Sequence, residues 1–330
     1  MSLFTLALMA VPPLSEGQSY AQPASYESGL ARFAGDMVDK HGFDPQDVRA
    51  LLARATYRQS IIDAMERPYE AKPWHQYRRL FLTPERISGG VAFWRDNATV
   101  LERAEAIYGV PPEIIVAIVG VETSYGARLG DHRALDALTT LGFSYPKRAD
   151  FFRGELEQLL LLNREGQVDA AAVVGSYAGA LGKPQFIPSS YRTYAVDFDG
   201  DGKRDLWGSD ADVIGSVAHY LSRHGWQPGE PVAVRASVSG TLPQDLEVAD
   251  KRPVAPSISV DRLRSAGVEC SEPVEGEVPT TLVRFEAPGD EYWIAFQNFY
   301  VITRYNHSNL YAMAAYQLSQ AVKERYRGGA

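Results

Sequence analysis

The sequence predicts a mainly helical α+β protein, and three observations support this fold class. Apolar residues recur at helical spacing from residue 26 to residue 226. Residues 228–296 instead carry short alternating apolar and polar runs, separated by Gly, Pro and Asp, which is typical of strands. Helical spacing returns over residues 309–325. The sequence therefore predicts a helical body that is interrupted once by a small β-rich insertion.

Composition limits the class of protein. The 330 residues are 45% apolar and 22% charged, enough to bury a sizeable core. The net charge of -8 is spread along the chain, without the basic stripe expected of a nucleic-acid-binding protein. Cys270 is the single cysteine, which excludes an intramolecular disulfide and thiolate metal clusters, and we interpret it as structural. Eighteen tyrosines and five tryptophans are compatible with packing on sugar rings.

The first residues have the character of an export signal. An apolar run from Leu3 to Val11 precedes Ser19-Tyr20-Ala21, with small residues where a signal peptidase cleaves. We interpret residues 1–21 as a signal peptide, with a disordered tail as the alternative. No cysteine for lipid attachment follows, and no later segment approaches the ~18 to 20 apolar residues of a spanning helix. We therefore expect a protein exported to the periplasm without a membrane anchor.

The helical elements follow in chain order. Leu30, Phe33 and Met37 share one helix face, and Asp44-Pro45 is a favourable helix start. Pro111-Pro112 opens another helix. Further helices are predicted over residues 150–163, 211–224 and 309–325, and strands over residues 232–238, 280–285 and 292–296.

The helix that starts at Pro111-Pro112 ends with a candidate acid. Residues 111–122 are apolar on every face after the first turn, which predicts a helix buried in a larger core. Glu122 lies in the last turn, before Gly126 can end the helix. Desolvation and the negative end of the helix dipole both raise the pKa of this carboxyl group. A protonated carboxylic acid is what cleavage of a glycosidic bond requires. The alternative is a buried glutamate that is hydrogen-bonded to backbone or paired with an arginine.

Five blocks of the chain carry a specific pattern, and they are residues 108–115, 120–123, 175–182, 185–191 and 298–308. Together, in this order, they resemble the lytic murein transglycosylase B family, glycoside hydrolase family 103. The resemblance covers nearly all of the mature length and implies a lysozyme-like catalytic core with an N-terminal α domain and a small inserted antiparallel β domain. The implied domains are 22–76 (N-terminal α domain, packing with the C-terminal helix), 77–227 (core), 228–296 (β insertion) and 297–330 (return to the core).

The resemblance implies a reaction at the β-1,4 bond between N-acetylmuramic acid and N-acetylglucosamine. Glu122 matches the family's catalytic acid, and no second carboxylate matches a partner for it. By implication, the N-acetyl group of the substrate stabilises the developing positive charge, and Glu122 then takes the proton of the C6 hydroxyl. The product is a 1,6-anhydromuramoyl end. The alternatives are a hydrolytic muramidase and a noncatalytic peptidoglycan-binding protein.

Further residues match the family's substrate cleft. Ser176 and Gln185 are implied to hydrogen-bond the acetamido group, with loop capping as the alternative. Lys147 and Arg148 stand where the family has two arginines that meet substrate carboxylates, although a lysine lacks the bidentate fork. Ser124-Tyr125 replaces the family's Arg-Trp, a change expected to alter subsite preference. Aromatic and amide groups that match cleft positions, each with a core role as the alternative, are Tyr77, Phe186, Tyr305, Asn306 and Tyr311.

An aspartate-rich segment predicts a calcium site. Residues 197–205 fit the first nine positions of an EF-hand loop, but position twelve is Gly208, which has no carboxylate. The resemblance implies a lengthened loop that Asp212 closes, with Asp210 as competitor. The ion would be structural, with no organic cofactor; the alternative is an aspartate-rich turn. A free calcium sensor is disfavoured because there is one loop. The predicted ligands are Asp197, Asp199, Asp201, the Lys203 carbonyl and Asp212.

These patterns together predict an exported enzyme that cleaves peptidoglycan. Its expected partners are glycan strands and proteins of cell-wall synthesis or remodelling, and the expected state is a monomer. Nucleic acid is excluded by the charge distribution.

Overall fold

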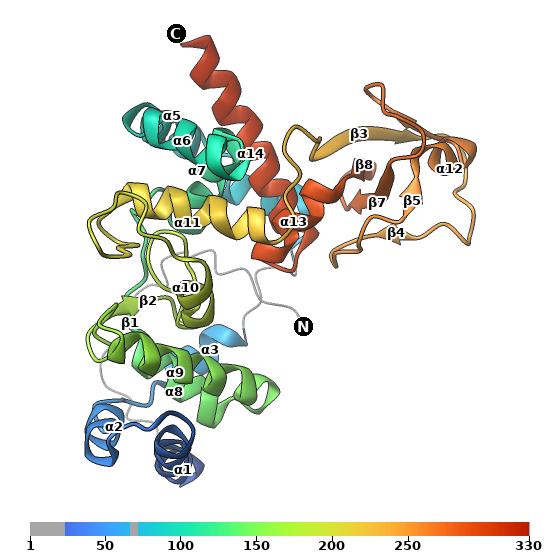
Figure 1. Ribbon diagram of the computed structural model, residues 1–330. Helices are drawn as coiled ribbons and strands as arrows, with labels where there is room; N and C mark the ends of the chain where they lie inside the picture. Colours follow the sequence, from blue (N-terminus) through green and yellow to red (C-terminus); the bar gives the residue numbers. More distant parts are fainter. Residues whose placement is uncertain (1–23, 67–71, 330) are drawn as a thin grey trace. The chain divides into compact units, whose positions relative to one another are not determined.

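The computed structural model describes residues 24–66 and 72–329 (Figure 1), so the proposed signal peptide, residues 1–21, lies outside the described residues. The chain forms two compact units. The first holds residues 72–125 and 214–329, and the second holds residues 24–66 and 126–213. The mainly helical fold class with a small sheet is confirmed.

The second unit is built from helices. In it, α1 and α3 pack on α8, and α8 packs on α9. Asp44 caps α2 by accepting hydrogen bonds from the backbone N–H groups of Gln46 and Asp47, as a helix start before proline requires. Tyr26 of α1 donates to Thr139 of α8 at 2.9 Å. The elements are α1 (Ala24–His41), α2 (Pro45–Leu52), α3 (Gln59–Met65), β1 (His132–Arg133), α8 (Ala134–Ser144), η3 (Pro146–Arg148), α9 (Ala149–Arg164), β2 (Val174–Gly175) and α10 (Pro188–Tyr194).

The first unit contains the C-terminal helix. This helix, α14, packs on α5 and α7, and the rings of Trp94 and Tyr326 stack at 4.4 Å between centroids. A further helix, α11 (Asp210–Arg223), begins in the second unit and continues into the first. The helices are α4 (Trp74–Tyr77), η2 (Arg78–Leu80), α5 (Pro84–Asp96), α6 (Ala98–Tyr108), α7 (Pro112–Thr123), α13 (Gln297–Tyr305) and α14 (Asn309–Gly328).

The domain boundaries differ from the expected ones. The segment expected to be one core, 77–227, is divided between the units at Tyr125 and Val213. Residues 24–66, expected to pack with the C-terminal helix, pack on α8 within the second unit, whereas α14 packs on α5 and α7 within the first. Helical periodicity marks which face of a helix is buried, but not which partner covers it.

The β-rich insertion forms a sheet in the order β4-β7-β8-β3-β6, and β5 also pairs with β7. The strand pairs are antiparallel, as expected, except that the two-residue strand β4 runs parallel to β7. Leu282 and Ile294 are opposite each other in the register and are fully buried in the insertion's own core. The elements are β3 (Ala233–Val238), β4 (Val248–Ala249), β5 (Ile258–Ser259), α12 (Val260–Ser265), β6 (Val268–Cys270), β7 (Pro279–Phe285) and β8 (Glu291–Ala295).

Across residues 24–66 and 72–329, no single helix has the length and apolar composition needed to cross a membrane. Only α6 and α7 taken together pass that test, and they are bent by 112° relative to each other.

Candidate active site

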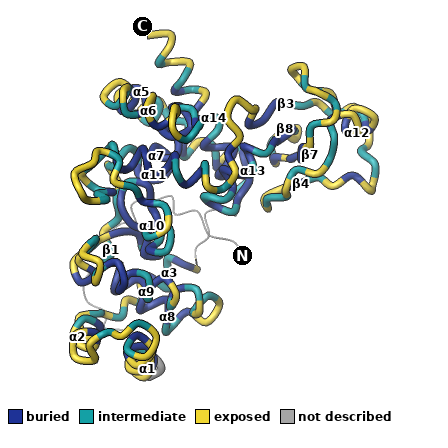
Figure 2. The backbone as a smooth tube through the Cα atoms, viewed as in Figure 1, coloured by how far each residue is buried: buried dark blue, intermediate teal, exposed yellow. Residues whose placement is uncertain are grey.

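Helix α7 positions the candidate acid. Pro112 occupies its first turn, and all twelve residues are buried, as the dark tube of α7 shows in Figure 2. The helix ends at Thr123, three residues before Gly126, because Ser124 adopts the left-handed conformation with φ 50°. The Ser124 N–H donates to the Gly120 carbonyl at 3.1 Å. Glu122 therefore lies in the last turn, as predicted, although the residue that ends the helix is not the predicted glycine.

The Glu122 carboxyl group is buried, with 6% of the residue exposed. Its Oε1 accepts a hydrogen bond from the Tyr311 hydroxyl at 2.5 Å. No ion pair to Glu122 is found among the described residues. Desolvation raises its pKa to about 8, against the hydrogen bond from Tyr311, which lowers it. At neutral pH this group is therefore mainly a protonated acid.

Two other buried glutamates show what a structural role looks like in this chain. Glu113, on the same helix, accepts a hydrogen bond from Lys323 Nζ at 2.5 Å and forms an ion pair with it. Glu155, in the second unit, accepts from the Ser189 backbone N–H at 2.9 Å and from its hydroxyl at 2.8 Å. The paired-glutamate alternative thus describes Glu113, whereas among the described residues the Glu122 side chain has only the Tyr311 hydroxyl as a partner.

Tyrosines of the first unit surround Glu122. The rings of Tyr305 and Tyr311 are stacked with an interplanar angle of 8° and centroids 6.4 Å apart. Tyr220 meets Tyr305 edge-on at 4.8 Å, and its hydroxyl donates to the Arg304 carbonyl at 2.7 Å. Burial, together with the charge of Glu122, raises the pKa of Tyr305 and Tyr311 well above their usual value. Both hydroxyls therefore stay protonated, and that of Tyr311 donates its hydrogen bond to Glu122.

Two more predicted residues lie in the first unit. Asn306 is 4% exposed, and its Oδ1 is a buried acceptor with no hydrogen bond among the described residues. Tyr77 of α4 is 1% exposed, and its ring packs against Phe81 at 5.2 Å. The contacts of Tyr77 are those of a core residue, and contact with sugar stays a prediction for it.

Tyr125 fixes the end of α7, a role that sequence reasoning missed. Its hydroxyl donates to the Arg86 carbonyl at 2.9 Å, and its ring packs on Phe93. Arg86 in turn donates to the Ser124 hydroxyl at 2.9 Å. These contacts make Ser124-Tyr125 part of the support for the helix end that carries Glu122.

Gly120 is required by this arrangement. A Cβ atom at position 120 would lie 2.5 Å from the Tyr125 hydroxyl, whereas one at Gly154 in α9 would meet nothing within 4 Å. We expect Gly120→Ala to destabilise the protein by about 1–3 kcal/mol through overpacking. The matched Gly154→Ala variant should be more stable than the wild type by up to about 1 kcal/mol. Urea unfolding measures both, and equal stabilities of the two variants would contradict the packing argument.

In the second unit, Ser176 caps its own loop. It is fully buried, and its Oγ accepts from the backbone N–H groups of Ala178 and Ala180 at 3.3 and 3.0 Å. The loop-capping alternative is therefore observed for this serine. A substrate contact stays a prediction.

Gln185 and Phe186 follow in the same loop region. Gln185 has a positive φ of 52°, and its Nε2 donates to the Gly182 carbonyl at 2.9 Å. Its Oε1 is buried and has no hydrogen bond among the described residues. Phe186 is 2% exposed, so its ring is part of the core. Gln185 thus keeps an acceptor for a ligand, and Phe186 has no exposed face in this structure.

Lys147 and Arg148 lie in η3 of the second unit and are engaged within the protein. Lys147 Nζ lies 2.9 Å from a carboxylate oxygen of Glu66 in an exposed ion pair. The Arg148 guanidinium lies 4.1 Å from the ring centre of Phe151, and desolvation lowers its pKa. Binding of substrate carboxylates by these two residues stays a prediction.

The aspartate-rich loop brings three predicted ligands together. Carboxylate oxygens of Asp197, Asp199 and Asp212 lie within 4.8 Å of one another. Gly200 and Gly202 have positive φ values of 82° and 91°, as a sharp turn requires. The Asp201 carboxylate is not in the group; its Oδ1 accepts from the Lys203 N–H at 2.8 Å.

The two candidates for closing the loop have different roles. Asp212 is fully buried, and its pKa is raised, mainly by desolvation and also by the charge of Asp199. Asp210 instead forms an ion pair with Lys183 at 2.5 Å. Three clustered carboxylates, one of them buried, fit a hard divalent cation with oxygen ligands. The geometry favours Asp212 over Asp210.

The chain is similar to known lytic transglycosylases in both sequence and structure. The family described as "Transglycosylase SLT domain" matches residues 25–320. The chain is 44% identical to the membrane-bound lytic murein transglycosylase B of Escherichia coli (strain K12), over 88% of this chain and 81% of that protein.

Solved structures of lytic transglycosylases also resemble this chain. The catenated lytic transglycosylase SltB1 from Pseudomonas aeruginosa superimposes with a TM-score of 0.84 at 47% identity, covering 93% of this chain and 99% of that one. The Escherichia coli lytic transglycosylase Slt35 in complex with calcium superimposes with a TM-score of 0.81 at 44% identity, covering 90% and 93%.

Proposed function

The chain belongs to the lytic murein transglycosylase family that carries the transglycosylase SLT domain, and we propose that Glu122 is its single catalytic acid and base. The observation that carries this assignment is a buried carboxyl group without a cation partner among the described residues, whose pKa is raised to about 8. As an acid, Glu122 donates its proton to the glycosidic oxygen as the bond to C1 of muramic acid breaks.

The second half of the reaction uses the carboxylate that remains. Glu122 accepts the proton of the C6 hydroxyl while that oxygen bonds to C1, so the acid is regenerated and no water is consumed. Tyr311 donates a hydrogen bond to Glu122 Oε1. This hydrogen bond stabilises the carboxylate during the interval in which it is charged, since bonds to the ionised form lower its free energy.

We further propose that two buried amide oxygens hold the substrate. Oδ1 of Asn306 in the first unit and Oε1 of Gln185 in the second unit have no hydrogen bond among the described residues. A buried acceptor without a partner costs about 1–3 kcal/mol. A substrate N–H, such as that of an acetamido group, would remove this cost at either position. Substrate contact stays a prediction for the other residues that match the family's cleft, which are Tyr77, Tyr305 and Tyr311 in the first unit and Lys147, Arg148, Ser176 and Phe186 in the second.

The products distinguish this chemistry from hydrolysis. Digestion of purified sacculi should release muropeptides that end in 1,6-anhydromuramic acid. Each should be lighter than the hydrolytic product by the mass of one water, about 18 Da, because no water is added. Mass spectrometry of the digest measures this. Reducing ends would indicate a muramidase, and no release at all would favour a noncatalytic binding protein.

The pH dependence of cleavage should report Glu122. Since the reacting acid has a pKa of about 8, kcat/KM should fall as pH rises through about 8, where the proton needed by the leaving oxygen is lost. Tyr311→Phe removes the hydrogen bond that lowers this pKa, so its alkaline limb should move to higher pH. Initial rates on soluble glycan strands between pH 5 and 10 test this, and identical limbs for the two proteins would contradict it.

We also propose a structural calcium ion and a periplasmic location. The relative Slt35 was solved in complex with calcium, and the carboxylates of Asp197, Asp199 and Asp212 fit such an ion here. The carbonyl of Lys203 and the carboxylate of Asp201 would complete its ligands. Murein lies outside the cytoplasm, which supports export by the proposed signal peptide. Calcium would hold the loop in place and would not take part in proton transfer.

A further inference from the structure

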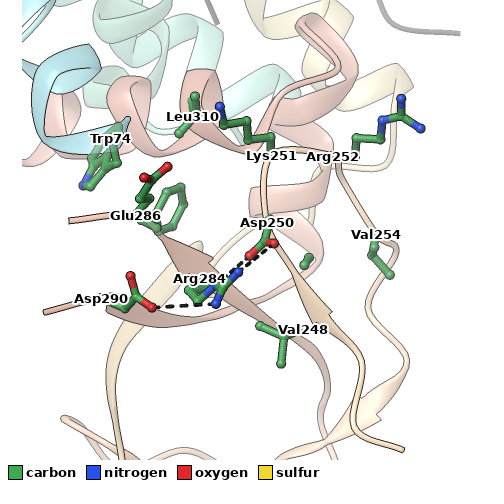
Figure 3. A pocket seen from close by; sticks show the side chains of 12 residues that line it. Trp74, Val248, Asp250, Lys251, Arg252, Val254, Arg284, Glu286, Asp290 and Leu310 are labelled. Carbon is green, nitrogen blue, oxygen red and sulfur yellow. Dashed lines mark hydrogen bonds and ion pairs between the residues drawn. The ribbon is translucent and has the colours of Figure 1, made fainter. Parts of the chain in front are cut away.

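The first turn of α14 is bonded to the inserted β segment. Buried Asn309 donates from its Nδ2 to the carbonyls of Asp250 and Arg252, at 2.7 and 3.0 Å. Its backbone N–H donates to the Lys251 carbonyl at 3.0 Å. Figure 3 shows this stretch of the insertion near Leu310 of α14, and both line a cavity of about 690 Å³. Three consecutive residues after β4 therefore accept hydrogen bonds from one residue of this turn.

The accepting stretch is itself anchored to the sheet. Arg284 of β7 donates from Nε and Nη2 to the two carboxylate oxygens of Asp250, at 2.9 and 3.0 Å. Such a bidentate pair fixes direction as well as distance. Thr281, also of β7, donates to the Val254 carbonyl at 3.2 Å. β7 pairs with β4, β5 and β8 within the insertion. The residues that hold the first turn of α14 are therefore attached to a paired strand at two points.

The same turn of α14 carries the partner of the candidate acid. Tyr311 lies two residues after Asn309, and its hydroxyl donates to Glu122 Oε1 at 2.5 Å. Its backbone N–H donates to the Ser308 hydroxyl at 3.4 Å. The N–H groups of a first turn have no partner inside the helix, so contacts outside the helix determine where that turn lies. Loss of the Asn309 contacts would let the turn move, and the Tyr311 hydroxyl with it.

We propose that Asn309 is a positioning residue for the catalytic acid, and that the inserted β segment supports catalysis through it. The inference rests on the proposed function, in which Glu122 transfers both protons. Tyr311 must keep its hydrogen bond in place while Glu122 is a carboxylate, and Asn309 holds the turn that carries Tyr311. The insertion thus acts on the reaction through residues that do not touch the reacting atoms.

Asn309→Ala is the first test. It should lower kcat by about tenfold or more and leave KM within about twofold of the wild type, because a displaced donor costs rate rather than ground-state binding. The alkaline limb of kcat/KM should move to higher pH, in the direction expected for Tyr311→Phe, because the hydrogen bond that lowers the pKa of Glu122 is weakened. Steady-state assays of anhydromuropeptide release measure both effects.

Asn298→Ala is the matched control. Asn298, on α13, is fully buried, and its Nδ2 donates to the carbonyls of Gln227 and Glu230 at 2.8 and 2.9 Å. Its Oδ1 also accepts from the Gln227 backbone N–H at 2.7 Å. This variant should lose at least as much melting temperature as Asn309→Ala, yet keep the wild-type alkaline limb and a kcat within a few-fold of the wild type. A merely structural role of Asn309 would make the two variants alike.

A double-mutant cycle tests whether Asn309 acts through Tyr311. In the Tyr311→Phe background, Asn309→Ala should cause no further shift of the alkaline limb and a smaller fall in kcat than in the wild type. Equal effects of Asn309→Ala in the two backgrounds would overturn the inference. A wild-type kcat and alkaline limb in Asn309→Ala itself would overturn it as well.

The part played by the sheet is tested at Arg284. Arg284→Met removes the anchor of Asp250 and should lower kcat by about twofold or more, with KM unchanged. The control Arg262→Met breaks an ion pair with Asp245 at 2.8 Å, which is similarly exposed and lies in the same β-rich segment. It should keep the wild-type kcat. Equal rates for the two variants would overturn the role of the sheet.

Titration of the Glu122 carboxyl group by carbon NMR separates this inference from the proposed function. The signal is assigned by its loss in Glu122→Gln, and its pKa should be higher in Asn309→Ala but unchanged in Asn298→Ala. Such a shift in a protein that releases no anhydromuropeptide would refute only the proposed function. Anhydromuropeptide release together with an unchanged pKa and kcat in Asn309→Ala would refute only the positioning role.

Discussion

Replacing Glu122 with glutamine is expected to lower kcat by roughly 10³- to 10⁴-fold, with KM little changed. The variant keeps the shape of the side chain and can still accept a hydrogen bond from Tyr311, which lies 2.5 Å from Oε1 in the wild type. It cannot give a proton to the leaving oxygen or take one from the C6 hydroxyl. Steady-state assay of anhydromuropeptide release measures the loss.

Glu113→Gln is the matched control for this variant. It changes a buried glutamate of the same helix, so a general effect of altering α7 would appear in both. We expect Glu113→Gln to lose stability, because Lys323 loses its ion-pair partner, while its kcat stays within a few-fold of the wild type. Full activity of Glu122→Gln would refute the catalytic assignment.

The pH dependence of stability tests the raised pKa of Glu122 without relying on catalysis. The folded pKa of Glu122, about 8, lies above its value in the unfolded chain, so the native state binds more protons between pH 4.5 and 8. The wild type should therefore lose stability as pH rises through this window, relative to the glutamine variant. Melting temperatures of both proteins at pH 5 and pH 8 measure the difference. An equal change in melting temperature for the wild type and the variant would contradict the raised pKa.

Removal of calcium is expected to give the second large effect. Binding to the native state alone stabilises a protein by about 2.7 kcal/mol when the ion is 100-fold above its Kd. For a chain of 330 residues, this corresponds to a melting temperature that is lower by roughly 4 °C after chelation. Differential scanning calorimetry with EGTA and with added calcium measures this shift.

Two aspartates provide matched variants for the calcium experiment. Asp212→Asn should abolish the response to calcium, because its carboxylate lies within 4.8 Å of those of Asp197 and Asp199. Asp210→Asn should keep the response, since that carboxylate pairs with Lys183. A wild type whose melting temperature is unaffected by chelation would refute the site, and the reverse pattern in the two variants would move its closure to Asp210.

Local sequence patterns determined several features of this protein. The apolar run of residues 111–122 is buried along its whole length, because a helix that is apolar on all faces can be stable only inside a core. The alternating runs of residues 228–296 form a sheet, because period-two alternation suits a strand with one buried face. The positive φ values of Gly200 and Gly202 agree with the turn that the aspartate-rich pattern predicts.

Contacts between distant residues were decided only by the tertiary structure. Tyr311, expected to line the cleft, donates a hydrogen bond to Glu122 across 189 positions of the chain. Asp210 and Asp212 are two positions apart, yet one pairs with Lys183 and the other is buried beside Asp197 and Asp199. Periodicity reports whether a side chain is buried, but its partner depends on how whole elements pack. The sequence therefore identified Glu122 as a candidate acid, and the fold determined its isolation from cations, which raises its pKa.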